Sequence, residues 1–454
     1  HPSQSNMAFP GVHDDPENFL VRLLVEGPPD LTPEGFGNLS IQGLIQTDFE
    51  VSVNGLPGTV TSSAYVGGEY WLLVEAPVQA ADGLYSMEVG LCSGMKSDIN
   101  SLSVLYGDYI FRHVVCLDVS GSMDNPETKL EAAKQAALFY VDTVRETHGI
   151  GLVSFSGDDV ESNQDATAFG GQLFQSNWLT RGLIKAAIDL YTAGGYTSIG
   201  DGLDVSQDII DADTTSGELI DTILLLSDGD QNEDALWDGG PVTQRFVGAP
   251  GTPGNDTVIN TLSFGQDANT NLMQDIAAST DGDHTYIEVN TGALKSRNNT
   301  GSMSLNLTMA YLAGTEKAQR LERLACINDS VREGARSEVS LDLSDTKVED
   351  GMVYIYWDGD PGDLDVTLLD PAGHEISNLE AEIFPPNNRP ERHRVWQMNA
   401  SLIAGKYTLS IENRSEKSVL FCAGISGRPW NQVKCELAFS SYLRSSLTFR
   451  PGGP

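Results

Sequence analysis

Positive charge is scarce in this sequence: 27 Lys and Arg stand against 64 Asp and Glu, which gives a formal net charge of -37 at neutral pH. A surface this acidic repels the phosphate backbone of nucleic acids and anionic lipid headgroups over a Debye length. Nucleic acid is therefore not expected as a partner. The same acidity suits an exterior rich in salt or calcium, and it equally suits a protein that is simply soluble.

Long apolar stretches are also lacking, and the longest are strand-length pieces such as TILLLSD at residues 222–228. A helix that crosses a bilayer needs ~20 apolar residues. We therefore expect no direct insertion into a membrane. A chain of 454 residues with 40% hydrophobic content is nevertheless long and apolar enough for two to four globular domains.

Cysteine is rare, with five residues and no CxxC pair, so neither a zinc ribbon nor a thioredoxin-like redox site is predicted. Cys422 and Cys435 flank a short, turn-rich segment and are a candidate disulfide. A pairing of Cys92 with Cys326 across domains stays open. Cys116 lies in the apolar segment HVVCLD and is predicted to be a buried free thiol.

Seven Asn-x-Ser/Thr sequons are candidate glycosylation sites, more than this composition leads us to expect. They begin at Asn38, Asn255, Asn298, Asn306, Asn328, Asn399 and Asn413. Together with a disulfide they favour an extracellular or cell-surface location.

Catalytic patterns are absent from the sequence. There is no HExxH zinc motif, no GxSxG nucleophile elbow, no GxxxxGK[ST] phosphate loop and no GxGxxG fingerprint. His374 and Glu375 are adjacent, but the second His of a zinc protease helix is missing. We therefore predict that the chain is not an enzyme and has no catalytic residues.

The pattern of apolar residues divides the chain into three parts. Residues 1–106 alternate short β-rich segments with Gly, Pro and Asp turns, which predicts a β-sandwich. Residues 107–318 alternate apolar strands with amphipathic helices, which is typical of a doubly wound, mostly parallel sheet covered by helices on both faces. Residues 319–454 return to β-type segments and predict a second sandwich, after a last helix that we expect to extend over 304–325.

The strongest motif is DVSGSM at residues 118–123, where a predicted buried strand gives way to a helix. In an open α/β sheet the carboxyl ends of the strands are where ligands bind. Two further segments, AGGYTSIGDGL at residues 193–203 and LLLSDGDQN at residues 224–232, also lie at the edges of predicted core elements. The alternative is that their Ser, Thr and Asp side chains only cap helices and loops.

These three segments resemble, in sequence and in order, the metal-ion-dependent adhesion site (MIDAS) of von Willebrand factor A domains, and the resemblance covers about residues 107–318. It implies that the hydroxyls of Ser120 and Ser122 bind the ion directly and that Asp118 holds it through water. Thr197 and Asp228 are implied to exchange direct and water-mediated contact between ligand-bound and unbound states. Tyr196, between the Gly pair and Thr197, is a local departure in spacing.

The chemistry of these residues agrees with that implication. Mg²⁺, or Ca²⁺ or Mn²⁺ in its place, prefers oxygen ligands and keeps some of its waters. Three neutral hydroxyls and only two carboxylates leave such an ion short of negative charge. A partner protein with an exposed Asp or Glu can then complete the shell.

A second, weaker candidate is the segment WDGDPGDLDVTLLDPAG, where Asp358, Asp360, Asp363 and Asp365 crowd around a turn. These carboxylates are a candidate calcium site, although turn formation alone also explains them. The segment loosely resembles β-sandwich modules behind secreted bacterial proteases and in calcium-activated chloride channel regulator proteins.

The sequence thus favours an extracellular, metal-dependent adhesion or assembly protein that binds a protein ligand, or a second copy of itself in a homo-oligomer or filament. Two alternatives stay open. One is a regulatory or protease-associated subunit like the chloride channel regulators, and the other is a structural subunit of a fibre or surface layer.

Overall fold

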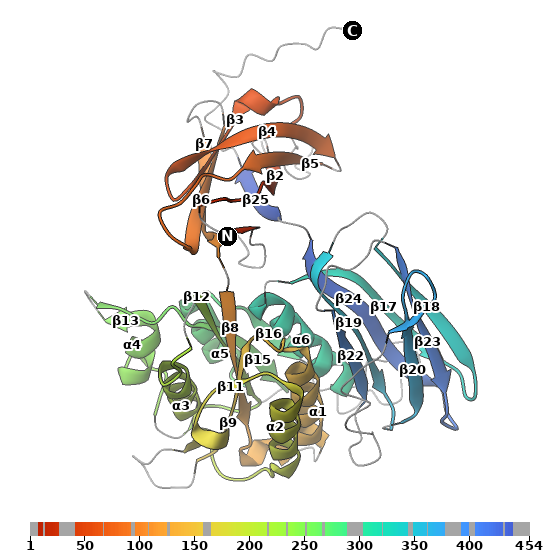
Figure 1. The fold of residues 1–454 in the computed structure, drawn as a ribbon. Coiled ribbons are helices and arrows are strands. Elements are labelled where there is room, and N and C mark those ends of the chain that lie inside the picture. Colours follow the sequence, from red (N-terminus) through yellow and green to blue (C-terminus); the bar gives the residue numbers. More distant parts are fainter. Residues whose placement is uncertain are drawn as a thin grey trace, which may run out of the picture. The chain divides into compact units, whose positions relative to one another are not determined.

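The fold is seen in a computed structural model, in which the chain divides into two compact units (Figure 1). One unit combines residues 1–108 with 429–454, and the other covers residues 109–428. The structure describes residues 8–11, 14–26, 41–66, 68–91, 96–107, 109–124, 128–157, 165–215, 218–232, 235–249, 252–265, 268–287, 303–319, 321–343, 348–360, 362–376, 392–398, 405–429 and 432–438. Over these ranges no helix is both long and apolar enough to cross a membrane.

The first unit is built on eight strands in the order β1-β7-β6-β3-β4-β5-β2-β25. Their bounds are β1 (Ala8–Gly11), β2 (Phe19–Glu26), β3 (Phe49–Val53), β4 (Leu56–Val66), β5 (Glu69–Glu75), β6 (Gly83–Leu91), β7 (Lys96–Tyr106) and β25 (Gln432–Ala438). Alternate residues of β2 and β5, such as Val21, Leu23, Leu72 and Val74, are buried in one apolar core. The predicted β-rich N-terminal region is therefore present.

The strand β25 comes from the end of the chain, yet it lies in the first unit. It pairs in parallel with β2, from Leu20 opposite Gln432 to Glu26 opposite Ala438. The expected C-terminal domain, residues 319–454, therefore differs from the structure at its end, because its last strand extends the N-terminal sheet. The sequence of β25 gave no sign of this, since a β-strand pattern does not specify its partner strand.

The second unit contains a central sheet in the order β10-β9-β8-β12-β15-β16, with β11 paired to β9. The strands are β8 (Tyr109–Asp118), β9 (Gly149–Phe155), β10 (Ala166–Ala168), β11 (Phe174–Gln175), β12 (Glu218–Ser227), β15 (Val258–Phe264) and β16 (His284–Ile287). The helices are α1 (Thr128–Thr143), α2 (Trp178–Leu190), α3 (Ile199–Asp211), α4 (Pro241–Val247), α5 (Thr270–Ser279) and α6 (Met303–Ala318), and a hairpin of β13 (Gly248–Ala249) and β14 (Thr252–Pro253) follows α4. The strands β9, β8, β12, β15 and β16 are parallel.

Both faces of this sheet are covered, as the prediction of a doubly wound α/β domain requires. On β8, Val115 and Leu117 pack under α1, α2 and α6, whereas Val114 and Cys116 pack under α3, α4 and α5. Successive residues of a strand point to opposite faces, so a strand buried on both sides is apolar throughout. The prediction that Cys116 is a buried free thiol is confirmed as well.

The last helix is shorter than expected. We expected helix up to residue 325, but α6 ends at Ala318, and β17 begins at Glu322. The following strands form two four-stranded sheets, β17-β24-β19-β22 and β18-β23-β20-β21, around a common core. Their bounds are β17 (Glu322–Val331), β18 (Arg336–Asp342), β19 (Val348–Asp358), β20 (Leu364–Leu369), β21 (Glu375–Ile376), β22 (His393–Gln397), β23 (Lys406–Asn413) and β24 (Val419–Pro429).

This sandwich packs on the α/β domain within the second unit. Phe139 of α1 and Leu312 of α6 share an apolar cluster with Tyr354 and Tyr356 of β19. One face of the helical layer is therefore covered by the sandwich and is not a free surface.

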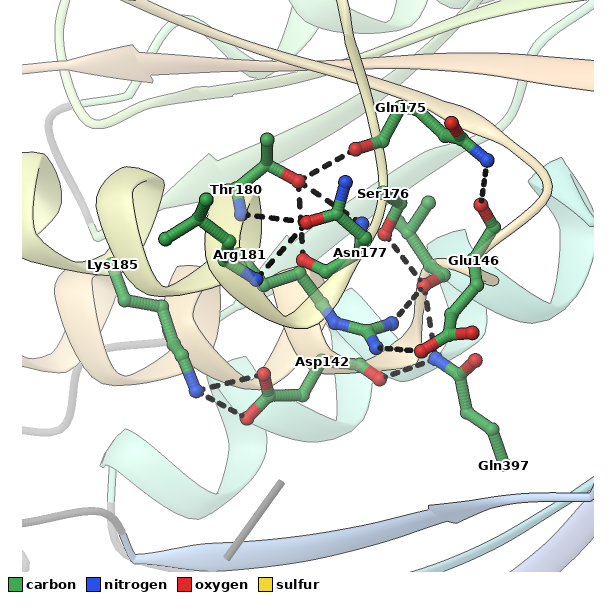
Figure 2. Close-up of polar contacts among 11 residues, drawn as sticks. Asp142, Glu146, Gln175, Ser176, Asn177, Thr180, Arg181, Lys185 and Gln397 are labelled. Carbon is green, nitrogen blue, oxygen red and sulfur yellow. Dashed lines mark hydrogen bonds and ion pairs between the residues drawn. The ribbon is translucent and has the colours of Figure 1, made fainter. Parts of the chain in front are cut away.

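Buried polar groups cross the same contact. Lys185 Nζ of α2 lies 2.8 Å from Asp142 Oδ1 of α1, and His393 Nε2 of β22 lies 2.8 Å from Asp142 Oδ2. Gln397 donates hydrogen bonds to the carbonyls of Asp142 and Val144, and Figure 2 shows Lys185 and Gln397 approaching Asp142 from opposite sides. Burial raises the pKa of Asp142, but Lys185 and His393 outweigh it and hold that pKa well below its ordinary value.

We predict that Asp142→Asn lowers the free energy of unfolding by about 3 kcal/mol, because Lys185 would stay buried without its counter-ion. Chemical denaturation of the full chain measures this change. Since the pKa of Asp142 is depressed in the folded state, the loss should be complete above pH ~4 and should shrink as the pH falls further.

The matched control is Glu412→Gln. It removes one partner of the Arg336–Glu412 ion pair, whose side chains are 75% and 38% exposed. An exposed pair contributes about 0–1 kcal/mol, so this variant should be nearly neutral. Equal effects of the two substitutions would refute the role given to the buried pair.

Candidate functional site

The three motifs meet at the carboxyl edge of the central sheet. Asp118 is the last residue of β8, and Asp228 directly follows β12. These strands are parallel neighbours, with Leu117 opposite Leu226, so the two carboxylates leave the sheet side by side. Thr197 lies just before α3, in the loop that faces both. Such an edge is where open α/β sheets bind ligands.

Asp118 is fully buried and fixed by hydrogen bonds. Its Oδ1 accepts from the Ser120 backbone N–H at 2.8 Å, and its Oδ2 accepts from the Ser227 hydroxyl at 2.6 Å. Burial, and to a smaller extent the negative charge of Asp228, raise the pKa of Asp118 to about 6. A cation nearby would relieve both effects.

The two serines connect Asp118 to Asp228. Ser120 Oγ lies 3.0 Å from Ser122 Oγ, and the Ser122 hydroxyl donates to Asp228 Oδ1 at 2.6 Å. Ser122 lies in the 3-10 turn η3 (Gly121–Asp124), and Ser120 directly precedes this turn after the end of β8. Four of the five predicted residues therefore form one continuous set of contacts.

Thr197, the fifth residue, lies near Ser122, and both hydroxyls border the position where Gly229 has no side chain. A Cβ placed on Gly229 would lie 3.1 Å from Thr197 Oγ1 and 3.3 Å from Ser122 Oγ. The Thr197 N–H also donates to Asn232 Oδ1 at 2.8 Å, and the Asn232 N–H donates back to the Thr197 carbonyl. The loop of Thr197 is thus tied to the loop of Asp228.

Lys129 is a component of the site that the sequence analysis missed. Its Nζ lies 2.6 Å from Asp228 Oδ2, and both side chains are buried. A cation in the first turn of a helix is opposed by the helix dipole, so a specific partner has to hold it there. The position of Lys129, in the first turn of the helix that follows DVSGSM, is the signal that could have pointed to it.

The departure in spacing at Tyr196 does not displace Thr197. Tyr196 and Gly157 exchange backbone hydrogen bonds of 2.9 and 2.7 Å, and the Tyr196 side chain is 44% exposed. Gly195 has a φ of 76°, and its carbonyl accepts from Gly121 N–H. The extra residue is accommodated in this turn, and Thr197 still faces Ser122.

The proposed second calcium site is not assembled. Asp363 Oδ2 accepts from the Asp360 N–H, Lys417 lies 3.4 Å from Asp360, and Arg414 pairs with Asp365. Within the described part of the chain, no three His, Cys, Asp or Glu side chains gather into a group that could hold a metal. Asp358 therefore belongs to no such group either. Turn formation and ion pairing account for these aspartates.

One glycosylation candidate needs a correction, and the structure brings a cysteine next to Cys422 that the sequence analysis did not pair with it. Cys422 Sγ lies 3.6 Å from Cys326 Sγ. The pairing of Cys422 with Cys435 stays a prediction, because the Cys435 side chain, like Cys92, lies outside the described residues. Asn413 is buried, and its amide donates to the carbonyls of Val331 and Lys417, so it is not an acceptor for a glycan in the folded chain.

The remaining sequons divide into two groups. Asn306 and Asn328 are exposed and Asn255 is half-buried. The other three, Asn38, Asn298 and Asn399, lie outside the described residues.

The five residues together fit a small, hard divalent cation. They offer three hydroxyl oxygens and two carboxylates, and Lys129 offsets part of the carboxylate charge. Oxygen donors of this kind suit Mg²⁺, Ca²⁺ and Mn²⁺ and do not suit soft metals.

We predict that Gly195→Ala destabilises the loop by about 1–3 kcal/mol or more, because an L-residue is strained at this φ and its Cβ would lie 2.1 Å from the Gly157 carbonyl oxygen. Gly194→Ala is the matched control, since nothing lies within 4 Å of a Cβ there. Thermal unfolding of both variants measures the difference. Equal melting points would show that Gly195 is not what shapes the turn.

Comparison with known proteins identifies the central domain. Residues 113–231, a range that contains all five site residues, match the family model described as von Willebrand factor type A domain. A UPF0353 protein of Nocardia farcinica is 26% identical over 230 residues, which are 48% of this chain and 62% of that protein. An uncharacterised protein of a Synechocystis strain is 29% identical over 183 residues, 39% of this chain and 38% of its own length. The chain thus spans less than two thirds of these curated relatives.

The chain is similar to several solved structures, at low sequence identity and low TM-score. A von Willebrand factor type A protein of Catenulispora acidiphila is 16% identical with a TM-score of 0.38, over 85% of this chain and 74% of that one. The pilus adhesin RrgA of Streptococcus pneumoniae is 9% identical with a TM-score of 0.34, over 92% and 84%. Similarities of this size say nothing about function. On the family match, this chain contains a von Willebrand factor type A domain, flanked by β-rich regions.

Proposed function

We propose that this chain is an extracellular, non-enzymatic adhesion or assembly protein whose von Willebrand factor type A domain binds an acidic group of a partner through a divalent ion. The convergence of Ser122, Thr197 and Asp228 around Gly229 carries the proposal. Hydroxyl and carboxylate oxygens from three separate loops are brought together there, and such oxygens are the ligands that hard divalent ions prefer.

Each residue has a distinct part in this proposal. Ser120, Ser122 and Thr197 offer neutral oxygens, while Asp118 and Asp228 supply negative charge. Bound there, Mg²⁺, Ca²⁺ or Mn²⁺ would be a Lewis acid short of negative charge that a partner's Asp or Glu carboxylate can bind. Lys129 strengthens this shortage, because its ammonium offsets one of the two carboxylates.

The site is also preorganised and accessible. Hydrogen bonds to both oxygens fix Asp118, so few conformations are lost when a ligand binds. Ser122 is half-buried and Gly121 beside it is exposed, so a partner can approach from the edge of the sheet.

We predict opposite effects of two substitutions on metal affinity, measured by calorimetric titration with Mg²⁺ or Mn²⁺. Ser122→Ala removes a ligand and should weaken binding by about tenfold or more. Lys129→Met removes a neighbouring positive charge and should tighten binding by about tenfold, since about 1.4 kcal/mol suffices for that factor. Ser340→Ala, an exposed serine of β18 in the sandwich, is the control.

Unaltered affinity in Ser122→Ala would remove this residue from the site. Weaker binding in Lys129→Met, with an unchanged melting curve, would mean that Lys129 positions Asp228 for the ion and does not compete with it.

A second copy of the chain is the partner that the charge distribution favours. The 64 acidic residues offer many carboxylates, and a contact between one copy's site and another's surface is head-to-tail, which extends into a filament unless it closes a ring. At a net charge of -37 the copies repel each other, so an ion-bridged contact provides the attraction that assembly needs.

We predict that particles of the full chain, followed by light scattering at constant ionic strength, grow with Mg²⁺ or Ca²⁺ and dissociate when a chelator is added. Ser122→Ala should stay monomeric under the same conditions. Assembly that ignores both the chelator and the substitution rules out an ion-bridged contact. A protein that binds metal yet stays monomeric at high concentration has a foreign acidic ligand instead.

A further inference from the structure

Two cysteines lie together on one side of the sheet β17-β24-β19-β22. The antiparallel register places Cys326 of β17 opposite Gly424 and Cys422 of β24 opposite Asn328, so the two cysteines are diagonal neighbours. Residues in such a relation point to the same side of the sheet. Their Sγ atoms are 3.6 Å apart, although 96 positions separate them in the sequence.

The two thiols have different surroundings. Cys326 is exposed, whereas Cys422 is fully buried against Phe139 and Tyr354. Arg323 lies three residues before Cys326 in β17. Its guanidinium donates hydrogen bonds of 3.0 and 2.7 Å to the carboxylate of Glu316. One sulfur is therefore open to solvent next to a fixed guanidinium, and the other is enclosed by apolar side chains.

The charge states follow from these surroundings. A hydrogen bond from the Cys422 thiol and the nearby Arg323 lower the pKa of Cys326 to about 6, although burial and Glu316 oppose this. The same hydrogen bond and burial raise the pKa of Cys422. The thiolate is the nucleophile in thiol–disulfide exchange, so the exposed sulfur is the reactive one at neutral pH.

We propose that Cys326 and Cys422 are a redox-active pair, in which Cys326 attacks a small-molecule disulfide and Cys422 resolves the product into an internal disulfide. In the first step the Cys326 thiolate forms a bond to one sulfur of RSSR, and RS⁻ leaves. In the second step the Cys422 sulfur attacks the Cys326 sulfur, and the second RS group leaves with the Cys422 proton as RSH. The two protein thiols are oxidised by two electrons, and RSSR is reduced to two thiols.

Closing the bond requires the sulfurs to approach from 3.6 Å to about 2.05 Å. The exposed Cys326 side chain has space to turn. Its strand also has a register irregularity between Arg323 and Ala325, where the backbone departs from regular pairing. The adjustment therefore falls on the exposed member and leaves the packed Cys422 in place.

The bond would connect the strand that enters the sandwich to the strand that leaves it. β17 begins four residues after the end of α6, and β24 ends at Pro429, one residue past the end of the second unit. A cross-link between distant positions restricts the unfolded chain, so oxidation should stabilise the sandwich. This role is separate from the metal site and does not depend on it.

The test is peptide mapping of the full chain. Reduced protein is incubated with oxidised glutathione, free thiols are alkylated, and the digest is analysed by mass spectrometry. We expect a peptide that joins Cys326 to Cys422, and a thermal midpoint several degrees higher than that of the reduced protein. Alkylation of both cysteines, or a link from Cys422 to Cys435, would overturn the proposal.

Single substitutions test the order of the steps. Cys422→Ser should trap glutathione on Cys326, whereas Cys326→Ser should leave Cys422 unmodified, and Cys116→Ser should behave like the wild type. The alkylation rate of Cys326 should be half-maximal near pH 6, in line with its pKa of about 6. Glutathione on Cys422 in the Cys326→Ser variant would contradict the assignment of Cys326 as the attacking thiol. If a variant does not fold, the mapping of the wild-type chain still decides the pairing.

Discussion

The parallel pairing of β8 with β12 is the constraint on which the candidate site depends. Its register, with Cys116 opposite Leu225 and Leu117 opposite Leu226, aligns two strands that are distant in sequence. The apolar residues of both strands are buried under helices on the two faces, so a slip by one residue would turn every side chain to the wrong face. The hydrophobic core thereby fixes how closely Asp118 and Asp228 approach each other.

Two carboxylates held this close in a buried place repel each other, and the surrounding residues show how the repulsion is limited. Asp118 receives only neutral donors, a backbone N–H and the Ser227 hydroxyl, whereas Asp228 receives the Lys129 ammonium. The pair therefore carries a partly balanced charge and keeps an attraction for cations. Neutral hydroxyls at Ser120, Ser122 and Thr197 add oxygen donors without adding repulsion.

Much of this arrangement could be predicted from the sequence, because it depends on order along the chain. Alternation of strands and helices over residues 107–318 determines which loops lie at the carboxyl edge, and the five oxygen-bearing residues lie in those loops. The end of α6 was missed, because Glu322, Arg323 and Ala325 suit a helix as well as a strand, and their pairing with β24 decides between the two.

Contacts between distant segments could not be predicted in this way. The approach of Cys326 to Cys422 depends on the register of β17 with β24, and the place of β25 depends on the free edge of β2. Sequence distance favoured Cys435 as the partner of Cys422. The burial of Asn413 likewise follows from its hydrogen bonds to Val331 and Lys417, which no sequon pattern reveals.

Helix α1 connects the candidate metal site to the sandwich. Lys129, in its first turn, contacts Asp228, and Phe139 and Asp142, near its end, contact β19 and β22. Thirteen residues of helix span about 20 Å as a stiff rod. Since both of its ends are held by buried ion pairs, Lys129–Asp228 and Asp142–Lys185, a shift of α1 along its axis would disturb both of them. The packing of the sandwich on the α/β domain therefore also restrains the position of Lys129 beside Asp228.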